Sequence, residues 1–232
     1  MVIDLIIPAL NEEASIGYSV RGIDRSLIRD VIVVDNGSTD ATTVQAAHAG
    51  ATVVSESRRG YGYACMRGTN YCRQKNTPPD LIVFMDGDGS DDPADLHKLV
   101  EPVTQDKADL VIGSRLKGYA AHGSLTTPQI FGNRLACFLM KIFFGAAYTD
   151  LGPLRAVRFS SLVEMHLTEM TYGWTVEMQI KAVRKRMRYT EVPVHYRNRA
   201  GGESKVSGTV RGVVLAGYRI LEVVFRHGLF RR

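Results

Sequence analysis

Two aspartates one residue apart, Asp86 and Asp88, follow the apolar run Leu81–Met85, so they lie where a buried strand meets a loop. Two carboxylates about 4 Å apart repel each other by about 4 kcal/mol at an effective dielectric constant of about 20, and a cation relieves that repulsion. Mg²⁺ binds one or two carboxylates and completes its shell with water and phosphate oxygens. The pair predicts a metal that grips a diphosphate, although Asp-Gly-Asp-Gly is also ordinary turn chemistry.

A second polar cluster, Asp35–Asp40, follows the apolar run Val31–Val34. One of its last three residues, a serine, a threonine and an aspartate, is suited to cap a following helix. Asp35 is also suited to accept a hydrogen bond from a nucleobase N–H or a ribose hydroxyl, as carboxylates at strand ends do in nucleotide-binding sheets. We expect a capped turn here, with Asp35 facing a nucleotide.

Cationic residues stand at two further places. Arg115 follows another apolar strand end, Val111–Ser114. The segment Arg199–Lys205 combines two cations with glycines and a hydroxyl, and such a loop can close over an anion and stabilise charge that develops on a leaving group. A solvated linker is the alternative interpretation of this segment. Glu177 lies four residues before Lys181, a spacing that favours an intrahelical ion pair.

The first half of the chain shows a clear pattern of strands and helices that would position these residues. Continuous apolar strands between helices indicate a mainly parallel sheet with both faces covered. Ligands bind such sheets beyond the carboxyl ends of the strands, where the polar clusters fall. The expected strands are Val2–Ile7, Val31–Val34, Thr52–Ser55, Leu81–Met85 and Leu110–Ile112, and the expected helices are Glu12–Val20, Ala41–Ala49, Gly62–Gln74 and Pro93–Thr104.

The second half is expected to continue the same α/β domain over residues 1–207, followed by a C-terminal amphipathic helix over residues 208–232 that serves packing, a dimer contact or a membrane-surface contact. One set of residues in the first helix of this half fits an interfacial helix and a core helix equally well: Phe131, Leu135, Phe138, Leu139, Ile142 and Phe143, with Lys141. The expected elements are a helix from Pro128 to about Phe144, an extended segment Tyr148–Arg158, helices Ser160–Thr168 and Thr175–Lys185, a strand Tyr189–Tyr196 and a final helix Gly208–Phe230.

Composition narrows the class of protein. The chain has 232 residues, 45% of them hydrophobic, enough for one sizeable core. Three cysteines without metal-ligand spacing predict a reducing compartment. No signal peptide is recognised, and no segment approaches the roughly 20 uncharged apolar residues of a membrane span. A cytoplasmic protein, free or peripheral at the inner membrane face, is expected. The net charge of +5 favours an anionic partner, but no nucleic-acid module is present.

These residues, in this order, resemble the family 2 glycosyltransferases of the nucleotide-diphospho-sugar transferase (GT-A) fold. Within that family they are most similar to dolichyl-phosphate mannose synthase and the related polyprenyl-phosphate glycosyltransferases. The matching stretches are Ile7–Glu13, Val34–Asp40, Met85–Ser90, Gly113–Arg115, Asp150–Arg155 and Arg199–Lys205.

The resemblance implies an inverting transfer of a hexose from a nucleotide sugar, GDP-mannose or UDP-glucose, to a polyprenyl or dolichyl phosphate, with Mg²⁺ or Mn²⁺ as cofactor. Where the mannose synthases usually carry Gln as a further metal contact, this chain has Ser90. The implied roles are nucleotide binding by Pro8, Asn11, Glu12, Asp35 and Asp86, metal binding by Asp86, Asp88 and Ser90, acceptor binding by Arg115, Arg134 and Arg155, and catalysis by Asp88, Arg115, Asp150, Arg199 and Lys205.

The acceptor decides which further groups are needed. A lipid phosphate is already an anion and needs no general base, so positioning and electrostatic stabilisation suffice. A sugar hydroxyl requires a carboxylate base, and Asp150 and Glu177 are the candidates. A transferase with a soluble hydroxyl acceptor is therefore the alternative. The alternative of another class is a non-catalytic module that binds a nucleotide sugar or an anionic lipid.

Overall fold

The computed structural model describes residues 1–201 and 210–229. Within them a seven-stranded sheet has the order β3-β2-β1-β4-β6-β5-β7, and β6 alone runs antiparallel to its neighbours. The strands are β1 (Ile3–Ala9), β2 (Asp30–Asp35), β3 (Thr52–Ser55), β4 (Leu81–Phe84), β5 (Leu110–Ala120), β6 (Arg155–Arg158) and β7 (Tyr189–Tyr196). The helices are α1 (Ile16–Arg21), α2 (Thr42–His48), α3 (Tyr61–Arg73), η1 (Pro93–Asp95), α4 (Leu96–Thr104), α5 (Thr127–Phe144), α6 (Phe159–Met165), α7 (Trp174–Arg184) and α8 (Val210–Leu229).

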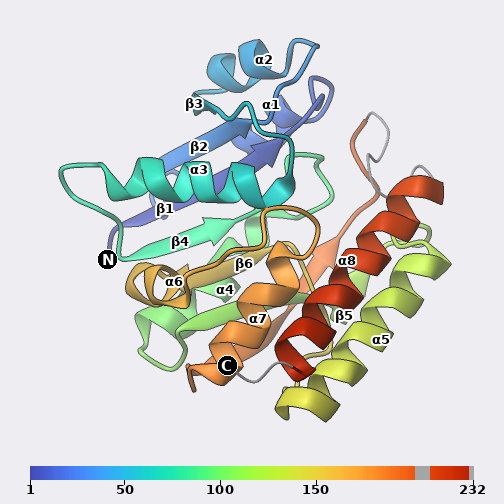
Figure 1. Cartoon of the computed structure of the whole chain (residues 1–232). Helices are drawn as coiled ribbons and strands as arrows, with labels where there is room; N and C mark the ends of the chain where they lie inside the picture. The colour runs from blue at the N-terminus through green and yellow to red at the C-terminus, as the bar shows by residue number, and fades with distance from the viewer. Residues whose placement is uncertain (202–209, 230–232) are drawn as a thin grey trace.

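Helices cover both faces of the sheet because its central strands are apolar on both sides. In β1, Leu5 and Ile7 point to one face and Ile6 to the other, as the period of two requires, and all three are fully buried. Side chains of α3, α5, α6, α7 and α8 pack on the Ile6 face, and side chains of α1, α2 and α4 pack on the opposite face (Figure 1). The sheet therefore lies at the centre of the core, and the polar residues lie at the ends of its strands.

The expected α/β architecture is confirmed, with differences at the ends of elements. Strand β5 continues to Ala120, eight residues beyond the expected end, because its outer part also pairs with β7, for example Tyr119 with His195. The helix expected from Glu12 begins only at Ile16, since residues 13–15 form a turn. Of the expected extended segment 148–158, only β6 is a strand.

The C-terminal helix α8 contributes to the same core as the sheet. Its Val223 and Val224 are fully buried, and α8 packs against α5 and α7. The expected boundary between residues 207 and 208 lies outside the described residues. Among the described helices, none is both long and apolar enough to cross a membrane.

All three cysteines are free thiols buried in the core. Cys65 and Cys72 lie on α3 and Cys137 lies on α5. Burial raises the pKa of the Cys72 thiol and that of the Cys137 thiol to about 12. These side chains are therefore protonated at neutral pH and act as small apolar groups.

Gly62 in α3 lies against the backbone at Glu169 and Met170. A Cβ at this position would stand 2.6 Å from the Glu169 carbonyl oxygen and from Met170 Cα. We expect Gly62→Ala to lower the free energy of unfolding by about 1–3 kcal/mol through overpacking, even though alanine favours helix. Urea unfolding measures this change.

The matched control is Gly132→Ala in α5, where nothing lies within 4 Å of the added Cβ. This variant should raise the free energy of unfolding by about 0.5–1 kcal/mol, because alanine loses less backbone entropy than glycine. If both variants shift stability in the same direction, the close approach at Gly62 does not limit packing.

Candidate active site

The polar clusters lie together at the carboxyl edge of the sheet. Asn11, Asp35, Asp86 and Arg115 lie at or just beyond the ends of β1, β2 and β4 and in the outer part of β5, and the parallel pairing brings these ends to one edge. The expected location of the site, beyond the strand ends, therefore matches the topology.

The loops after β1 and β2 are tied to each other by side chains. Asn11 takes a left-handed backbone conformation with φ of 53°, which asparagine tolerates. Its backbone N–H donates to Ser38 Oγ at 2.9 Å. The Thr39 amide donates to Asn11 Oδ1 at 2.8 Å. Asp35 accepts from the Ser38 amide at 3.0 Å and from the Gly37 amide at 3.3 Å, so its carboxylate shapes the turn.

Three carboxylates crowd the loop after β4. The Asp86 amide donates to Asp91 Oδ2 at 3.0 Å, and the Tyr61 hydroxyl donates to Asp86 Oδ1 at 3.3 Å. Burial, and next the charge of Asp88, raise the pKa of Asp86 to about 7, and burial with the Asp86 charge raises the pKa of Asp91. Burial and the neighbouring carboxylates thus favour the protonated forms of Asp86 and Asp91.

Arg199 supplies positive charge to this edge from far along the chain. Its Nη1 donates to Asp88 Oδ2 at 2.7 Å, and its Nη2 donates to both carboxylate oxygens of Glu12 at 2.6 and 2.7 Å. The Ala200 amide donates to the Asp88 carbonyl at 3.0 Å. The start of the predicted anion-binding loop thus bridges the loops that follow β1 and β4.

Arg115 is locked onto Asp150, a pairing that motif spacing did not predict. The Arg115 amide and Nε donate to Asp150 Oδ2 at 2.8 and 2.9 Å, and its Nη2 donates to Oδ1 at 2.6 Å. The Asp150 side chain is fully buried, and the guanidinium carbon lies 5.1 Å from the centre of the Tyr196 ring. This bidentate geometry fixes the guanidinium at the outer part of β5.

Arg155 does not reach the site, which argues against the expected acceptor contact. It is fully buried, and its guanidinium donates to the carbonyls of Thr175 at 3.0 Å and Leu151 at 2.7 Å, and to that of Gly152. Burial without a carboxylate partner lowers its pKa. Arg155 braces the loop that precedes β6 against α7.

The second candidate base, Glu177, is also fully buried in α7. Its carboxylate accepts from Thr168 Oγ1 at 2.7 Å, from the Glu169 amide at 2.8 Å and from Lys181 Nζ at 2.9 Å, which confirms the expected intrahelical ion pair. Burial alone would raise its pKa, but the Lys181 ammonium, the Glu169 amide and the Thr168 hydroxyl hold it well below the usual range, with the His227 ring 3.7 Å from Oε1. Glu177 therefore acts as a structural anion.

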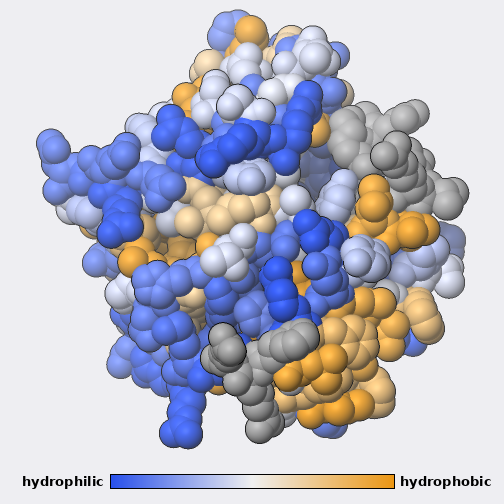
Figure 2. Space-filling view, viewed as in Figure 1, coloured by the Kyte–Doolittle hydropathy of each residue, from blue (hydrophilic) through white to orange (hydrophobic). Residues whose placement is uncertain are grey.

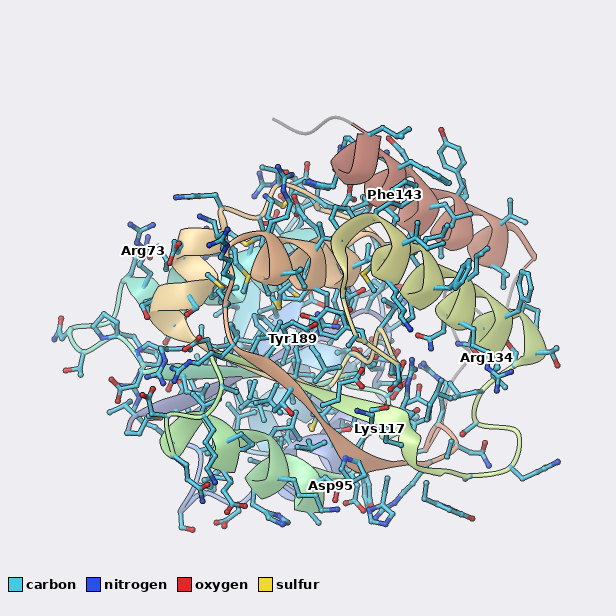
Figure 3. The ribbon with its side chains drawn as sticks, turned by 90° about the horizontal axis from the view of Figure 1, so that it is seen from below. Arg73, Asp95, Lys117, Arg134, Phe143 and Tyr189 are labelled. Atoms are coloured by element: carbon cyan, nitrogen blue, oxygen red, sulfur yellow. The ribbon has the colours of Figure 1, made fainter. Side chains whose placement is uncertain are left out.

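The other expected site residues occupy different surroundings. Pro8 lies within β1. Ser90 shapes the loop through its backbone, because its amide donates to Asp88 Oδ1 at 2.9 Å and its carbonyl accepts from the Arg197 amide at 2.7 Å. Arg134 is exposed on α5 (Figure 3). Lys205 lies outside the described residues.

Two residues of the site had no role in the sequence-based interpretation. Asp91 lies against Asp86, and Glu191 in β7 accepts from the Thr149 amide at 2.7 Å and from the Asp150 amide at 3.1 Å. Asp91 follows Asp88 by three residues in the same loop, and this proximity could have drawn attention to it. Glu191 is the one acidic residue of β7 and belongs to no motif. Only the tertiary structure shows that it holds the loop of Asp150.

Residues 4–165 match the sequence profile described as glycosyl transferase family 2, which is more than half of the chain. The chain is a family 2 glycosyltransferase. An uncharacterized glycosyltransferase of Mycobacterium tuberculosis is 33% identical over 214 residues, which are 92% of this glycosyltransferase and 94% of that protein. The undecaprenyl-phosphate mannosyltransferase of Micrococcus luteus is 32% identical over 218 residues, 89% of this chain and 88% of that protein.

The structure is also similar to that of a solved enzyme. The glucosyl-3-phosphoglycerate synthase of Mycobacterium tuberculosis, crystallised with Mn²⁺, UDP and glucosyl-3-phosphoglycerate, has a TM-score of 0.77 at 23% identity. The match covers 100% of this chain and 81% of that one. This likeness confirms the expected GT-A fold.

The buried pair of Arg115 and Asp150 predicts a large effect on stability. Asp150→Asn should lower the free energy of unfolding by about 3–5 kcal/mol, because it leaves the guanidinium charge without its partner. Asp106→Asn is the control: Asp106 pairs with Arg158 and Arg188 at 2.8 and 2.9 Å, but its side chain is 74% exposed, so the cost should stay below about 1 kcal/mol. Urea unfolding compares the two, and equal losses would contradict the role given to burial.

Proposed function

We propose that this glycosyltransferase moves a hexose from a nucleotide sugar, GDP-mannose or UDP-glucose, to a polyprenyl phosphate. The observation that carries the proposal is that both candidate bases, Asp150 and Glu177, are buried and held in ion pairs. A hydroxyl acceptor needs a free base, whereas a phosphate oxygen is already an anion. Because a polyprenyl acceptor is held in a membrane, the enzyme would work peripherally at its inner face.

The donor side fits a divalent metal ion such as Mg²⁺ or Mn²⁺. Asp86 and Asp88 offer hard oxygen ligands one residue apart, and burial with the charge of Asp88 raises the pKa of Asp86, which a cation between the two carboxylates would reverse. We assign these two carboxylates to the metal. When bound, the ion neutralises the diphosphate of the donor. Asn11, Glu12 and Asp35, from the loops beside it, would line the nucleotide pocket together with Pro8.

The chain's own cations would handle the acceptor and the leaving group. Arg115, oriented by Asp150, and the exposed Arg134 would position the acceptor phosphate. An oxygen of the acceptor phosphate attacks the anomeric carbon of the hexose as the bond from that carbon to the diphosphate oxygen breaks. This displacement inverts the configuration at the anomeric carbon. Arg199 and Lys205 would neutralise the departing nucleoside diphosphate.

Two relatives support this acceptor by their names. One is the undecaprenyl-phosphate mannosyltransferase of Micrococcus luteus described above. The other is a UDP-N-acetylglucosamine–dolichyl-phosphate N-acetylglucosaminyltransferase of Methanococcus voltae, 27% identical over 214 residues. Both transfer a sugar to a lipid phosphate, as we propose here.

The test is a transfer assay with purified protein, Mn²⁺ and a panel of nucleotide sugars, with and without undecaprenyl phosphate. We expect release of GDP or UDP that depends on the lipid. Asp88→Asn should reduce it by at least about a hundredfold. Asp24→Asn, an exposed substitution far from the site, should leave it unchanged. Turnover that is the same with and without undecaprenyl phosphate would contradict a polyprenyl-phosphate acceptor. Binding of a nucleotide sugar without turnover would favour a non-catalytic module.

A soluble phosphorylated acceptor is the second candidate. The structurally similar glucosyl-3-phosphoglycerate synthase was crystallised with UDP and glucosyl-3-phosphoglycerate, so 3-phosphoglycerate is the small phosphorylated acceptor to test. The same assay with 3-phosphoglycerate in place of the lipid distinguishes the two. Turnover with phosphoglycerate alone would replace the polyprenyl acceptor, while the need for Asp88 would persist.

Arg199 should compete with a metal ion for Asp88, since its Nη1 lies 2.7 Å from the carboxylate. Arg199→Gln removes a charged hydrogen bond and should tighten Mn²⁺ binding without nucleotide by about tenfold. The control is Arg197→Gln, whose guanidinium pairs with Asp92 in the same region and should not affect Mn²⁺. Titration calorimetry with Mn²⁺ alone measures both. Weaker Mn²⁺ binding by Arg199→Gln would show that the arginine supports the metal.

A further inference from the structure

The packed helices α5 and α8 share an exposed apolar face. We define the α5–α8 face by seven outward side chains on these two helices. Their exposed fractions run from 40% for Phe225 to 68% for Phe131. The members are Phe131, Phe138 and Ile142 on α5, and Val214, Tyr218, Phe225 and Leu229 on α8. Figure 2 shows apolar residues gathered at the lower right, where Figure 1 places these helices.

Helix α8 is apolar on two opposite sides, and only one of them is needed by the core. Ala216, Val223 and Val224 are buried against the rest of the domain. The outer residues Val214, Tyr218, Phe225 and Leu229 recur at intervals of four, seven and four, which places them in one stripe along the helix. Scattered exposed apolar residues are normal, but a contiguous patch of this kind marks an interaction surface.

The charges on this face all favour an anionic surface. Arg134 and Lys141 are exposed within the apolar stripe of α5, which contains no acidic residue. Glu222 is the one acid in α8, and Arg219 neutralises it at 2.7 Å. A second copy related by a two-fold axis would bring the cations of α5 toward the same cations, without acids to pair them. Charge complementarity therefore favours lipid phosphates over another copy of the chain.

The lower end of the face opens into a groove with the same mixed character. The ends of α5, α7 and α8 enclose about 740 Å³ here. Apolar side chains of α5 form one wall, and Arg184 at the end of α7, Arg186 just after it and His227 of α8 bring basic groups to the other. The lining residues are Ile142, Phe143, Phe144, Gly145, Val183, Arg184, Arg186 and His227. Aliphatic and aromatic surface beside cations suits the boundary between acyl chains and anionic headgroups.

The inner side of α5 is connected directly to the candidate site. Asn133 Nδ2 donates to the Thr149 carbonyl at 3.1 Å, and its Oδ1 accepts from the Leu151 amide at 2.8 Å. These two bonds hold the loop that carries Asp150, the partner of Arg115. The same helix therefore supports the site on one side and carries the apolar face on the other.

We propose that the α5–α8 face docks this glycosyltransferase onto an anionic lipid bilayer. Phe131, Phe138, Tyr218 and Phe225 enter the interfacial layer, and Lys141 binds a lipid phosphate beside them. The docking goes beyond the proposed transfer, because it is a property of the surface and needs neither a donor nor a polyprenyl acceptor.

The experiment is flotation of the whole chain with vesicles of phosphatidylglycerol and phosphatidylcholine in equal parts, without nucleotide sugar or polyprenyl phosphate. We expect binding that weakens as salt is raised. The double variant Phe138→Glu/Tyr218→Glu should bind at least about tenfold more weakly, and Lys141→Ser about fivefold more weakly. Vesicles of phosphatidylcholine alone should bind the wild-type protein less than the anionic mixture.

The control is Tyr18→Glu, which places one of these two negative charges at an aromatic residue that is 52% exposed on α1 and outside this face. It should bind vesicles as the wild-type protein does, and urea unfolding should show that the double variant is folded. If Tyr18→Glu loses as much vesicle binding as the double variant does, added negative charge alone explains the loss and the proposal is overturned. A stable dimer in light scattering that the double variant dissociates, with no flotation of the wild-type protein, would assign the face to a second copy. Failure of the transfer assay alone would leave the flotation result standing.

Discussion

Crowding of negative charge at the carboxyl edge of the sheet is the constraint around which this site is arranged. Asp86, Asp88 and Asp91 leave one strand within a single short loop, and Glu12 approaches from the neighbouring strand. Backbone amides relieve part of the repulsion, and the guanidinium of Arg199 relieves more. This requirement connects the halves of the chain, because the acids come from the first half and their cation comes from the second.

The fold was largely predictable because its central strands are buried on both faces and therefore appear as uninterrupted apolar runs. The strand Thr52–Ser55 and the start and end of α2 and α3 agree with expectation to within a residue or so. The outer part of β5 was not predictable. It mixes charged residues with glycine and apolar residues and has no strand-like alternation, and it forms a strand because β7 offers backbone partners there, a tertiary effect that local propensity does not contain.

The positions of the site residues were predictable where the sheet topology determines them. They were not predictable where side-chain packing determines them. Parallel strands bring Asp35 and Asp86 to one edge whatever the details of the loops. The pairing of Arg115 with Asp150 and the burial of Arg155 depend on how the loop before β6 packs, and arginines in a sequence usually imply exposure. The apolar residues of α5 were ambiguous for a similar reason, since periodicity alone does not show which apolar side of a helix meets the core.

The three buried thiols have a practical consequence for studying this enzyme in solution. Alkylating reagents attack the thiolate, and Cys65, Cys72 and Cys137 are both shielded and protonated at neutral pH. A cysteine introduced at an exposed position would therefore be the reactive one in the folded chain. Single-site attachment of a spin label or a fluorophore then requires no prior removal of the native cysteines, so the core that surrounds them stays intact.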